Sequence, residues 1–228
     1  MKIISTEGFI ISTTKYGESS KILNIFTKEY GVIGVISKGC TGSKSVLKNV
    51  SERFIYAKFN ISYKEGKLST LISADIINYF KNIRSDIILI AYLTYITELT
   101  SDVFKQNNDL QIYDLFISSL IKIEENLDPL VITNILETKY LDYLGIMPVI
   151  DSCAVCGKKD NITTLSSYRG GYVCKDCFKN EKIVSSKTIK LIRMFCYVDI
   201  SKISKLELSE QAKNEINIFL NDYYDRYT

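Results

Sequence analysis

The first third of the chain alternates apolar and polar side chains with the two-residue period of β-strands. From Ile55 to Tyr63 every odd-numbered residue is apolar, which predicts a strand with one buried face. Four further runs rich in Ile, Val, Phe and Tyr are separated by glycine-containing turns. Five short strands must close on themselves or leave edges exposed. The small closed solution is an OB-type barrel, although an SH3-like barrel fits the strand count nearly as well. The predicted strands are Ile3–Ile11, Lys21–Thr27, Gly31–Ser37, Arg53–Tyr63 and Leu68–Asp75.

Beyond residue 75 the apolar residues recur with the spacing of helices. Capping residues mark three of the helix starts, one of them Asp109. Ser85 precedes the first helix, and Asp128, followed by Pro129 at the first helical position, precedes the third. The predicted helices are Asp86–Lys105, one capped by Asp109, one from Asp128 to Leu144, one near Lys187–Val198 and one near Ser209–Tyr227.

The two patterns together predict an α+β, multidomain protein. Residues 1–78 form the five-stranded OB-type barrel, and residues 79–150 with 183–228 form an α-helical domain. Residues 151–182 carry four cysteines and are predicted to be a metal-binding insert within the helical domain.

These four cysteines form two Cys-x-x-Cys pairs with the spacing of a zinc ribbon. Cys153 with Cys156 and Cys174 with Cys177 are separated by 17 residues. Each tight turn aims two sulfur atoms at a shared ion, and two turns complete a tetrahedron of thiolates. With four ligands and no open position, the predicted site holds one structural Zn²⁺ per chain.

Two disulfides or a thioredoxin-like redox pair are the alternatives for these cysteines. A cytosolic chain disfavours structural disulfides, and a redox pair belongs beside a βαβ unit. Gly157 is expected to take a positive φ after the first pair, and Arg169-Gly170-Gly171 is expected to turn a hairpin. Of the two remaining cysteines, Cys196 is expected in the helical core and Cys40 as an exposed thiol in a polar loop.

Composition removes several classes of function. The chain of 228 residues has no His, which excludes the Ser-His-Asp triad and every imidazole-dependent metal site. It has no Trp, so base stacking would fall to its 16 Tyr and 10 Phe. Acidic pairs such as Glu124-Glu125 are expected on solvated helix faces, so no carboxylate cluster of a two-metal nuclease is apparent. No apolar run approaches the length of a membrane span and no signal peptide is recognisable, so a cytoplasmic protein is expected.

Charge is uneven along the chain. The net charge is +3, but residues 1–78 hold 11 basic and 6 acidic residues, whereas residues 79–228 hold 18 and 20. No acidic residue occurs from Tyr30 to Ser51. Cations on a glycine- and serine-rich loop suit a phosphate backbone, although a plain solvated loop is the alternative. The candidate phosphate-binding residues of this region are Lys38, Lys44, Lys48 and Arg53.

The order of these parts resembles the RecO family of bacterial recombination mediators. Tyr16–Leu23, running on to Phe26–Gly31, is similar to the opening strands of that family. Ser37–Gly39 with Ser43–Leu47 is similar to its basic barrel loop. Leu141–Pro148, leading into the cysteine pairs, is similar to its junction between helix and zinc site.

The resemblance implies a non-enzymatic protein that binds single- and double-stranded DNA and anneals complementary strands. It also implies that, with the ring-forming RecR protein, such a protein helps a recombinase load onto strands coated by single-strand-binding protein. One departure is Cys40-Thr41, where the family commonly has further basic residues. Phosphate contacts are therefore expected to be shared with Lys21, Lys48 and Arg53.

One partner surface and three alternative functions complete the predictions. The acidic, apolar-tipped tail of single-strand-binding protein needs an apolar groove rimmed by cations. The helix near Lys187–Val198 offers Lys187, Lys190 and Arg193 for that rim, although its apolar residues fit helix packing almost equally well. The alternatives in other classes are a zinc-ribbon interaction module of the transcription machinery, a metal-dependent nuclease and a thiol oxidoreductase.

Overall fold

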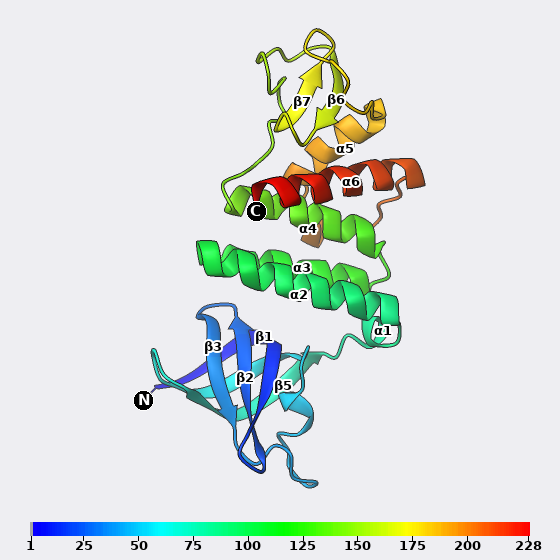
Figure 1. Cartoon of the computed structure of the whole chain (residues 1–228). Coiled ribbons are helices and arrows are strands. Elements are labelled where there is room, and N and C mark those ends of the chain that lie inside the picture. The colour runs from blue at the N-terminus through cyan, green and yellow to red at the C-terminus, as the bar shows by residue number, and fades with distance from the viewer. Residues whose placement is uncertain (1) are drawn as a thin grey trace. The chain divides into compact units, whose positions relative to one another are not determined.

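The computed structural model describes residues 2–228 and confirms the predicted α+β fold (Figure 1). Five strands close into a barrel in the order β1-β2-β3-β5-β4, and β3 and β5 are its parallel neighbours. This arrangement is that of an OB-type barrel. The strands are β1 (Lys2–Tyr16), β2 (Ser20–Thr27), β3 (Gly31–Ser37), β4 (Tyr56–Tyr63) and β5 (Ser69–Asn78).

The alternation read from the sequence defines the interior of the barrel. In β4, Ala57, Phe59 and Ile61 are fully buried, and in β3 the odd-numbered residues point inward. The even-numbered positions of β3, from Val32 to Ile36, therefore form part of its outer face. β1 extends five residues beyond the predicted strand end at residue 11, with a bulge between Ile10 and Ser12 that lets it bend around the barrel.

Aromatic rings cover part of the outer face of β1 and β2. Ile10 and Ile25 belong to the barrel interior, so their neighbours Phe9 and Phe26 lie on the opposite face of the sheet. The Phe9 ring meets Phe116 edge-on at 5.0 Å and Phe80 at 6.0 Å between centroids. The Phe26 ring meets Tyr113 at 5.3 Å, also edge-on. Phe80 adopts a left-handed backbone conformation, with φ of 51°, which costs energy in a residue with a Cβ. Its fully buried ring compensates for that cost.

All five predicted helices are present, with one correction at a helix cap. Asp128 accepts hydrogen bonds from the backbone N–H groups of Leu130 and Val131, as its position before a proline predicted. Ser85, in contrast, closes a short additional helix, and Asp86 caps the long one. The helices are α1 (Lys81–Arg84), α2 (Ile87–Asn107), α3 (Gln111–Glu124), α4 (Pro129–Tyr143), α5 (Ser186–Tyr197) and α6 (Glu210–Tyr227), with 3₁₀ turns at Asn49–Ser51 and Ile200–Lys202.

The chain divides into two compact units. The first comprises the described residues up to Leu93 together with Asn108–Ile117, and the second comprises Thr94–Asn107 together with Ser118–Thr228. By compactness, the first turns of α2 and α3 therefore group with the barrel. The domain limits inferred from the sequence, at residues 78, 150 and 182, stay predictions.

Helix α2 is the one described helix that is long and apolar enough to cross a membrane by length and composition. One third of its most apolar window is buried within the protein. The sequence analysis missed this feature because polar residues interrupt the apolar run. A single helix of this kind is weak support for a membrane span, because core helices of soluble proteins meet the same criterion.

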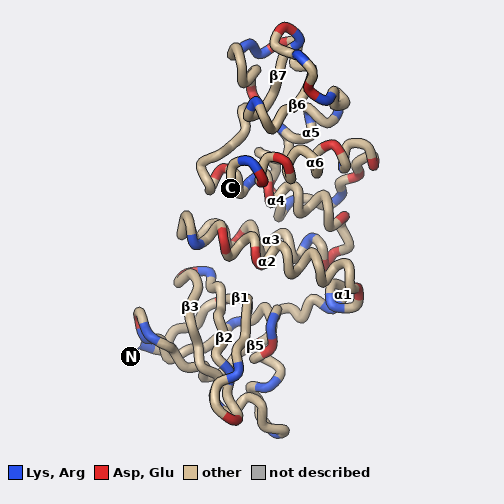
Figure 2. The backbone as a smooth tube through the Cα atoms, viewed as in Figure 1, with Lys and Arg blue, Asp and Glu red and all other residues tan. Residues whose placement is uncertain are grey.

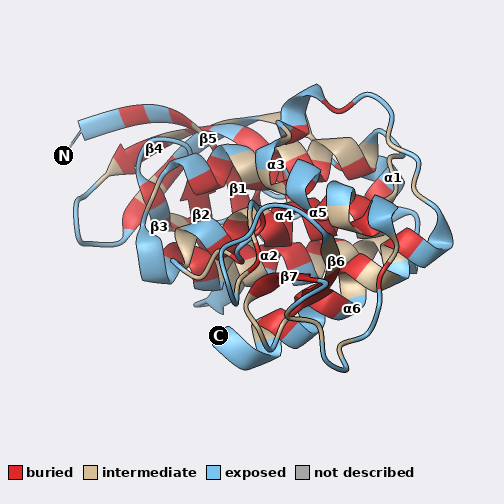
Figure 3. Ribbon diagram, turned by 90° about the horizontal axis from the view of Figure 1, so that it is seen from above, coloured by how far each residue is buried: buried red, intermediate tan, exposed pale blue. Residues whose placement is uncertain are grey.

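In the second unit, α4 is buried on almost every side (Figure 3). Its Glu137 is only 4% exposed. The Tyr95 hydroxyl donates a hydrogen bond to one carboxylate oxygen of Glu137 at 2.5 Å, and the other oxygen has no partner among the described residues. Burial raises the pKa of Glu137 to about 7, although the hydrogen bond from Tyr95 works in the opposite direction.

This raised pKa predicts a pH-dependent stability. The unfolded chain ionises Glu137 near pH 4.5 and the folded chain near pH 7, so the stability present at low pH is lost as the pH rises through this window. Between pH 4.5 and pH 8 the parent should lose free energy of unfolding because Glu137 ionises. We expect Glu137→Gln to lose about 3 kcal/mol less over the same range. Urea titrations at both pH values measure this difference. Exposed Glu98→Gln is the control, and parallel pH profiles for Glu137→Gln and the parent would contradict the assignment.

Candidate metal centre and nucleic-acid interface

The four cysteines of the two Cys-x-x-Cys pairs converge on one point. All four Sγ atoms lie within 4.8 Å of one another, and those of Cys156 and Cys174 are 3.6 Å apart. Ligand–metal distances of ~2.3 Å in a tetrahedron require neighbouring sulfur atoms roughly 3.8 Å apart. The set therefore fits a tetrahedral thiolate site, and none of the six cysteines, all of them within the described residues, forms a disulfide.

Two turns and a hairpin bring the cysteines together. Strands β6 (Ile162–Ser166) and β7 (Gly171–Cys174) pair antiparallel, so the second cysteine pair returns to the first. Gly157 takes the predicted positive φ, 76°, and its N–H donates to the carbonyl of Cys153. The Cys177 N–H donates to the carbonyl of Cys174 in the second turn. Local hydrogen bonds close both turns. Each two-residue spacer therefore directs its two sulfur atoms toward the shared point without a strained backbone.

Backbone donors also favour the ionised form of one ligand. Burial raises the pKa of Cys153, but hydrogen bonds from the backbone N–H groups of Cys174, Val155 and Cys156 outweigh it and lower that pKa to about 6. A thiolate is the form that binds a metal. Among the described residues, no other group of three or more Cys, Asp or Glu side chains converges closely enough to hold an ion.

Gly171 fixes how the hairpin joins the preceding chain. Its φ is 148°, and a Cβ at this position would lie 2.2 Å from the carbonyl oxygen of Val149. The Val149 N–H donates to the carbonyl of Gly170, and the Tyr172 N–H donates to that of Val149. The predicted turn at Arg169-Gly170-Gly171 is thus confirmed, and only glycine permits this close backbone approach.

The predicted basic loop of the barrel has a defined backbone conformation. Successive turns close it, with the N–H groups of Gly42, Ser45 and Lys48 donating to carbonyls three residues earlier. The Thr41 N–H donates to the carbonyl of Ser19 and ties the loop to the turn between β1 and β2. Lys48 is exposed, as are the other lysines of the loop, Lys38 and Lys44. Figure 2 marks the basic and acidic residues along the backbone.

The expectation of an exposed thiol at Cys40 is wrong. This residue is only 2% exposed. The flanking glycines suggested a solvated loop, but the turns fold the Cys40 side chain inward, where a small apolar residue is favourable. Cys196 is partly buried in α5, and burial raises its pKa to about 12.

The other two candidate cations of the barrel already have partners. Lys21 forms an ion pair with Glu52 at 2.8 Å and is largely covered. Arg53 donates through Nε to the carbonyl of Ile11, and its guanidinium lies 4.2 Å from the centre of the Phe54 ring. The three loop lysines are therefore the more accessible set, and the role of all five cations in DNA binding stays a prediction.

The three candidate partner-binding cations of α5 also differ in whether they already have an acidic partner. Lys187 and Lys190 are exposed. Arg193 donates to Asp151 at 2.7 Å, and the same carboxylate accepts a hydrogen bond from Tyr197. This pairing lowers the pKa of Asp151. The buried residues of α5 are Thr188, Ile192 and Phe195.

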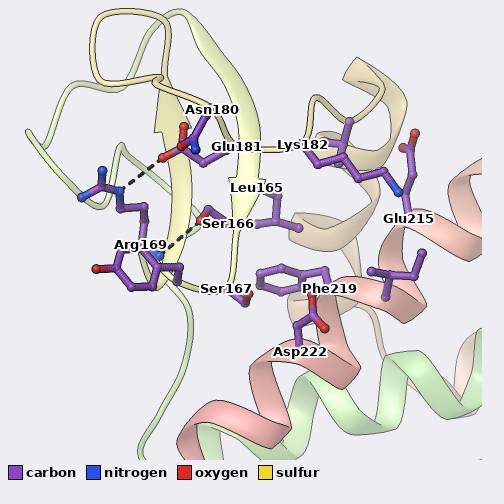
Figure 4. Close-up of a pocket in the computed structure, with 13 residues that line it drawn as sticks. Leu165, Ser166, Ser167, Arg169, Asn180, Glu181, Lys182, Glu215, Phe219 and Asp222 are labelled. Atoms are coloured by element: carbon purple, nitrogen blue, oxygen red, sulfur yellow. Dashed lines mark hydrogen bonds and ion pairs between the residues drawn. The ribbon is translucent and has the colours of Figure 1, made fainter.

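A cavity that sequence reasoning did not find lies between the cysteine hairpin and α6 (Figure 4). Its volume is about 320 Å³, and its walls include Leu165, Phe219 and Glu215. Glu215 accepts hydrogen bonds from the Ser185 N–H and from the Thr188 hydroxyl, and Arg169 pairs with Glu181 at 3.2 Å. Glu215, Arg169 and Glu181 are already engaged in these interactions. The cavity is therefore best described as a polar contact between the hairpin and α6. Its residues are dispersed along the sequence, so no local pattern marks it.

The structure defines a class of protein that combines a closed OB-type barrel, a helical region and a hairpin with four clustered cysteines. Comparison with known proteins gives the family. Residues 1–80 match the family model described as Recombination protein O N terminal, and residues 84–228 match Recombination protein O C terminal. The chain therefore belongs to the RecO family of DNA repair proteins.

Named relatives agree along nearly the whole chain. The DNA repair protein RecO of Bacillus pumilus is 34% identical over 230 residues, covering 99% of this chain and 90% of the relative. That of Halalkalibacterium halodurans is 30% identical, with 97% and 89% covered. That of Listeria monocytogenes is 31% identical, with 97% and 88% covered.

We expect one metal ion per chain in the freshly purified protein. Replacing Cys174, a buried ligand, with Ser should abolish metal retention and expose the hairpin to proteolysis, because binding energy is folding energy in such sites. Elemental analysis by mass spectrometry measures and identifies the metal. Cys196→Ser is the matched control and should keep the full complement. Less than half an equivalent in the parent would contradict a resident metal.

Proposed function

We propose that this protein is a non-enzymatic recombination mediator in DNA repair. In this role it binds single- and double-stranded DNA and anneals complementary strands. With RecR, it promotes loading of a recombinase onto strands coated by single-strand-binding protein. The observation that carries the proposal is an OB-type barrel with three exposed lysines on an ordered loop, in a chain of the RecO family.

The barrel supplies the DNA contacts in this proposal. Lysines without fixed acidic partners favour phosphates and carry no sequence preference, as annealing of arbitrary strands requires. Lys38, Lys44 and Lys48 make the principal contacts. Lys21 and Arg53 lie at the edge of the same region and contribute less, because an acidic residue and a backbone carbonyl already engage them.

The cysteine module has a structural role in the proposal, and its ion is Zn²⁺. Four thiolates in a tetrahedral set leave no open position for a substrate, and Zn²⁺ is the common ion of such sites. Clustering of all four sulfur atoms also favours a metal over a redox pair, which needs only two. We assign residues 1–78 to DNA binding, 151–182 to the zinc insert, and 79–150 with 183–228 to the helical domain.

Partner proteins complete the proposal. An acidic peptide tail, such as that of single-strand-binding protein, suits the exposed lysines of α5, Lys187 and Lys190, with Arg193 at the margin. The proposed setting is the bacterial cytoplasm, in association with the nucleoid.

Strand annealing tests the proposed function. We expect Lys38→Ala with Lys44→Ala to slow annealing of bare complementary strands and to weaken single-strand binding. The slope of log affinity against log salt should become less negative by about 1.4, since each phosphate contact contributes roughly 0.7. Lys202→Ala with Lys205→Ala removes the same charge from exposed positions outside the barrel and is the control. Equal slopes for the parent and the barrel variant would place the phosphate contacts elsewhere.

The same assay separates DNA contacts from partner contacts. On strands coated by single-strand-binding protein, Lys187→Glu with Lys190→Glu should lose annealing while keeping it on bare strands. Degradation of either strand in the presence of Mg²⁺ or Mn²⁺ would contradict a non-enzymatic role.

A further inference from the structure

A second hollow lies on the barrel, at the end of β3 that is away from the basic loop. It has a volume of about 390 Å³ and is formed by the start of β3 and the turn between β4 and β5. The basic loop follows Ser37 at the other end of β3. The two ends of this strand are about 20 Å apart, at roughly 3.3 Å per residue. The hollow is thus distinct from the loop to which the sequence drew attention.

Two tyrosine rings form one wall of this hollow. Tyr30 and Tyr63 have ring centres 5.2 Å apart and planes tilted by 43°, and Tyr30 is 37% exposed. Their rings come from elements 33 residues apart in sequence, so no local motif reveals the pair. Exposed aromatic rings are the platforms on which proteins stack the bases of single strands.

An apolar floor continues from these rings. Val32 is 41% exposed and Leu68 is 37% exposed, so both present apolar surface to the hollow. Gly34 lies between them on the outer face of β3 and leaves the floor open. A Cβ at this position would lie 3.4 Å from Cδ1 of Leu68, with no strained φ to prevent it. The floor is hollow because this residue has no side chain.

Cations border the rings. Lys64 and Lys67 are both exposed on the turn that joins β4 to β5. The acidic residue of that turn, Glu65, partly offsets them, and Glu29 beside Tyr30 accepts a hydrogen bond from the Thr6 hydroxyl. The site therefore offers stacking surface in excess of charge. An acidic peptide would find less attraction here than on the basic loop.

The geometry points to a base-stacking site for single-stranded DNA at Tyr30 and Tyr63, with Lys64 and Lys67 holding the flanking phosphates. This inference rests on the proposed function and deepens it. Paired bases hide their faces within the duplex, so the site selects single strands. Lysines of the basic loop attract either form through phosphates. A strand engaged at both places is held with its bases separated, as annealing requires.

The protein has no tryptophan, which makes a direct optical test possible. In Tyr30→Trp the single indole reports only on this hollow. Titration with an oligothymidylate should quench its fluorescence, whereas a duplex of the same length should not. Tyr79→Trp, at another exposed tyrosine of the same unit, is the matched control and should respond to neither.

Affinity measurements complete the test. Tyr30→Leu with Tyr63→Leu should weaken single-strand binding at least about fivefold, without changing the salt slope or the affinity for duplex. Tyr30→Phe with Tyr63→Phe should bind like the parent, because stacking needs the ring and not the hydroxyl. Gly34→Val, which fills the floor on a solvent-facing strand position, should weaken binding even if the leucine variant fails to fold.

The outcomes separate this inference from the proposed function. If the parent binds single strands but the indole is not quenched, or if the leucine and valine variants bind normally, the stacking site is wrong and the mediator role stands. Equal quenching by duplex would also overturn it, as would quenching only by RecR or single-strand-binding protein. If the parent binds no single-stranded DNA at all, the proposed function itself fails.

Discussion

Closure of the barrel is the constraint on which the accessible surfaces of the first unit depend. Parallel pairing of β3 with β5 joins the sheet into a ring, and only two residue pairs, from Val35 and Ile36, make that contact. Closure removes the exposed strand edges that would otherwise pair with other chains. It also directs alternate side chains outward. The outer face of β3, the loop that follows it and the turn before β5 are therefore positioned by one pairing.

The aromatic cluster on the outer face of β1 and β2 leaves the rest of the barrel surface for ligand binding. Phe9, Phe26, Phe80 and Phe116 cover that face with ring-to-ring contacts, so it is closed to a ligand. A protein that handles DNA strands of any sequence needs an open lateral surface more than an enclosed pocket. In the proposed function, the exposed lysines beyond one end of β3 and the tyrosine pair at the other end meet that need.

The cysteine module depends on a different source of stability. Its hairpin is small, and β7 has four residues, too few to supply a substantial apolar core of its own. The four sulfur atoms can compensate, because a metal held by them would link both turns and contribute its binding energy to folding. The buried Glu137 in α4 has the opposite effect, since it makes the second unit less stable as the pH rises.

The features that the sequence predicted correctly depend on residues that lie close together in the chain. The alternation in β4, the caps at Asp109 and Asp128, and the cysteine spacing all describe interactions between residues close in sequence. Burial of Cys40, by contrast, depends on how successive turns fold back, and the partners of Lys21 and Arg53 come from other segments. The Tyr30–Tyr63 pair needed the closed barrel before it could be recognised.

The central claim is that the barrel binds DNA and that the cysteine module has only a structural role. Hydrogen–deuterium exchange of the full-length, metal-loaded protein, with and without an oligothymidylate, tests it most directly. We expect slower exchange at residues 28–48 and 63–69 and unchanged exchange at residues 151–182. Protection confined to residues 151–182, with the barrel unaffected, would contradict it.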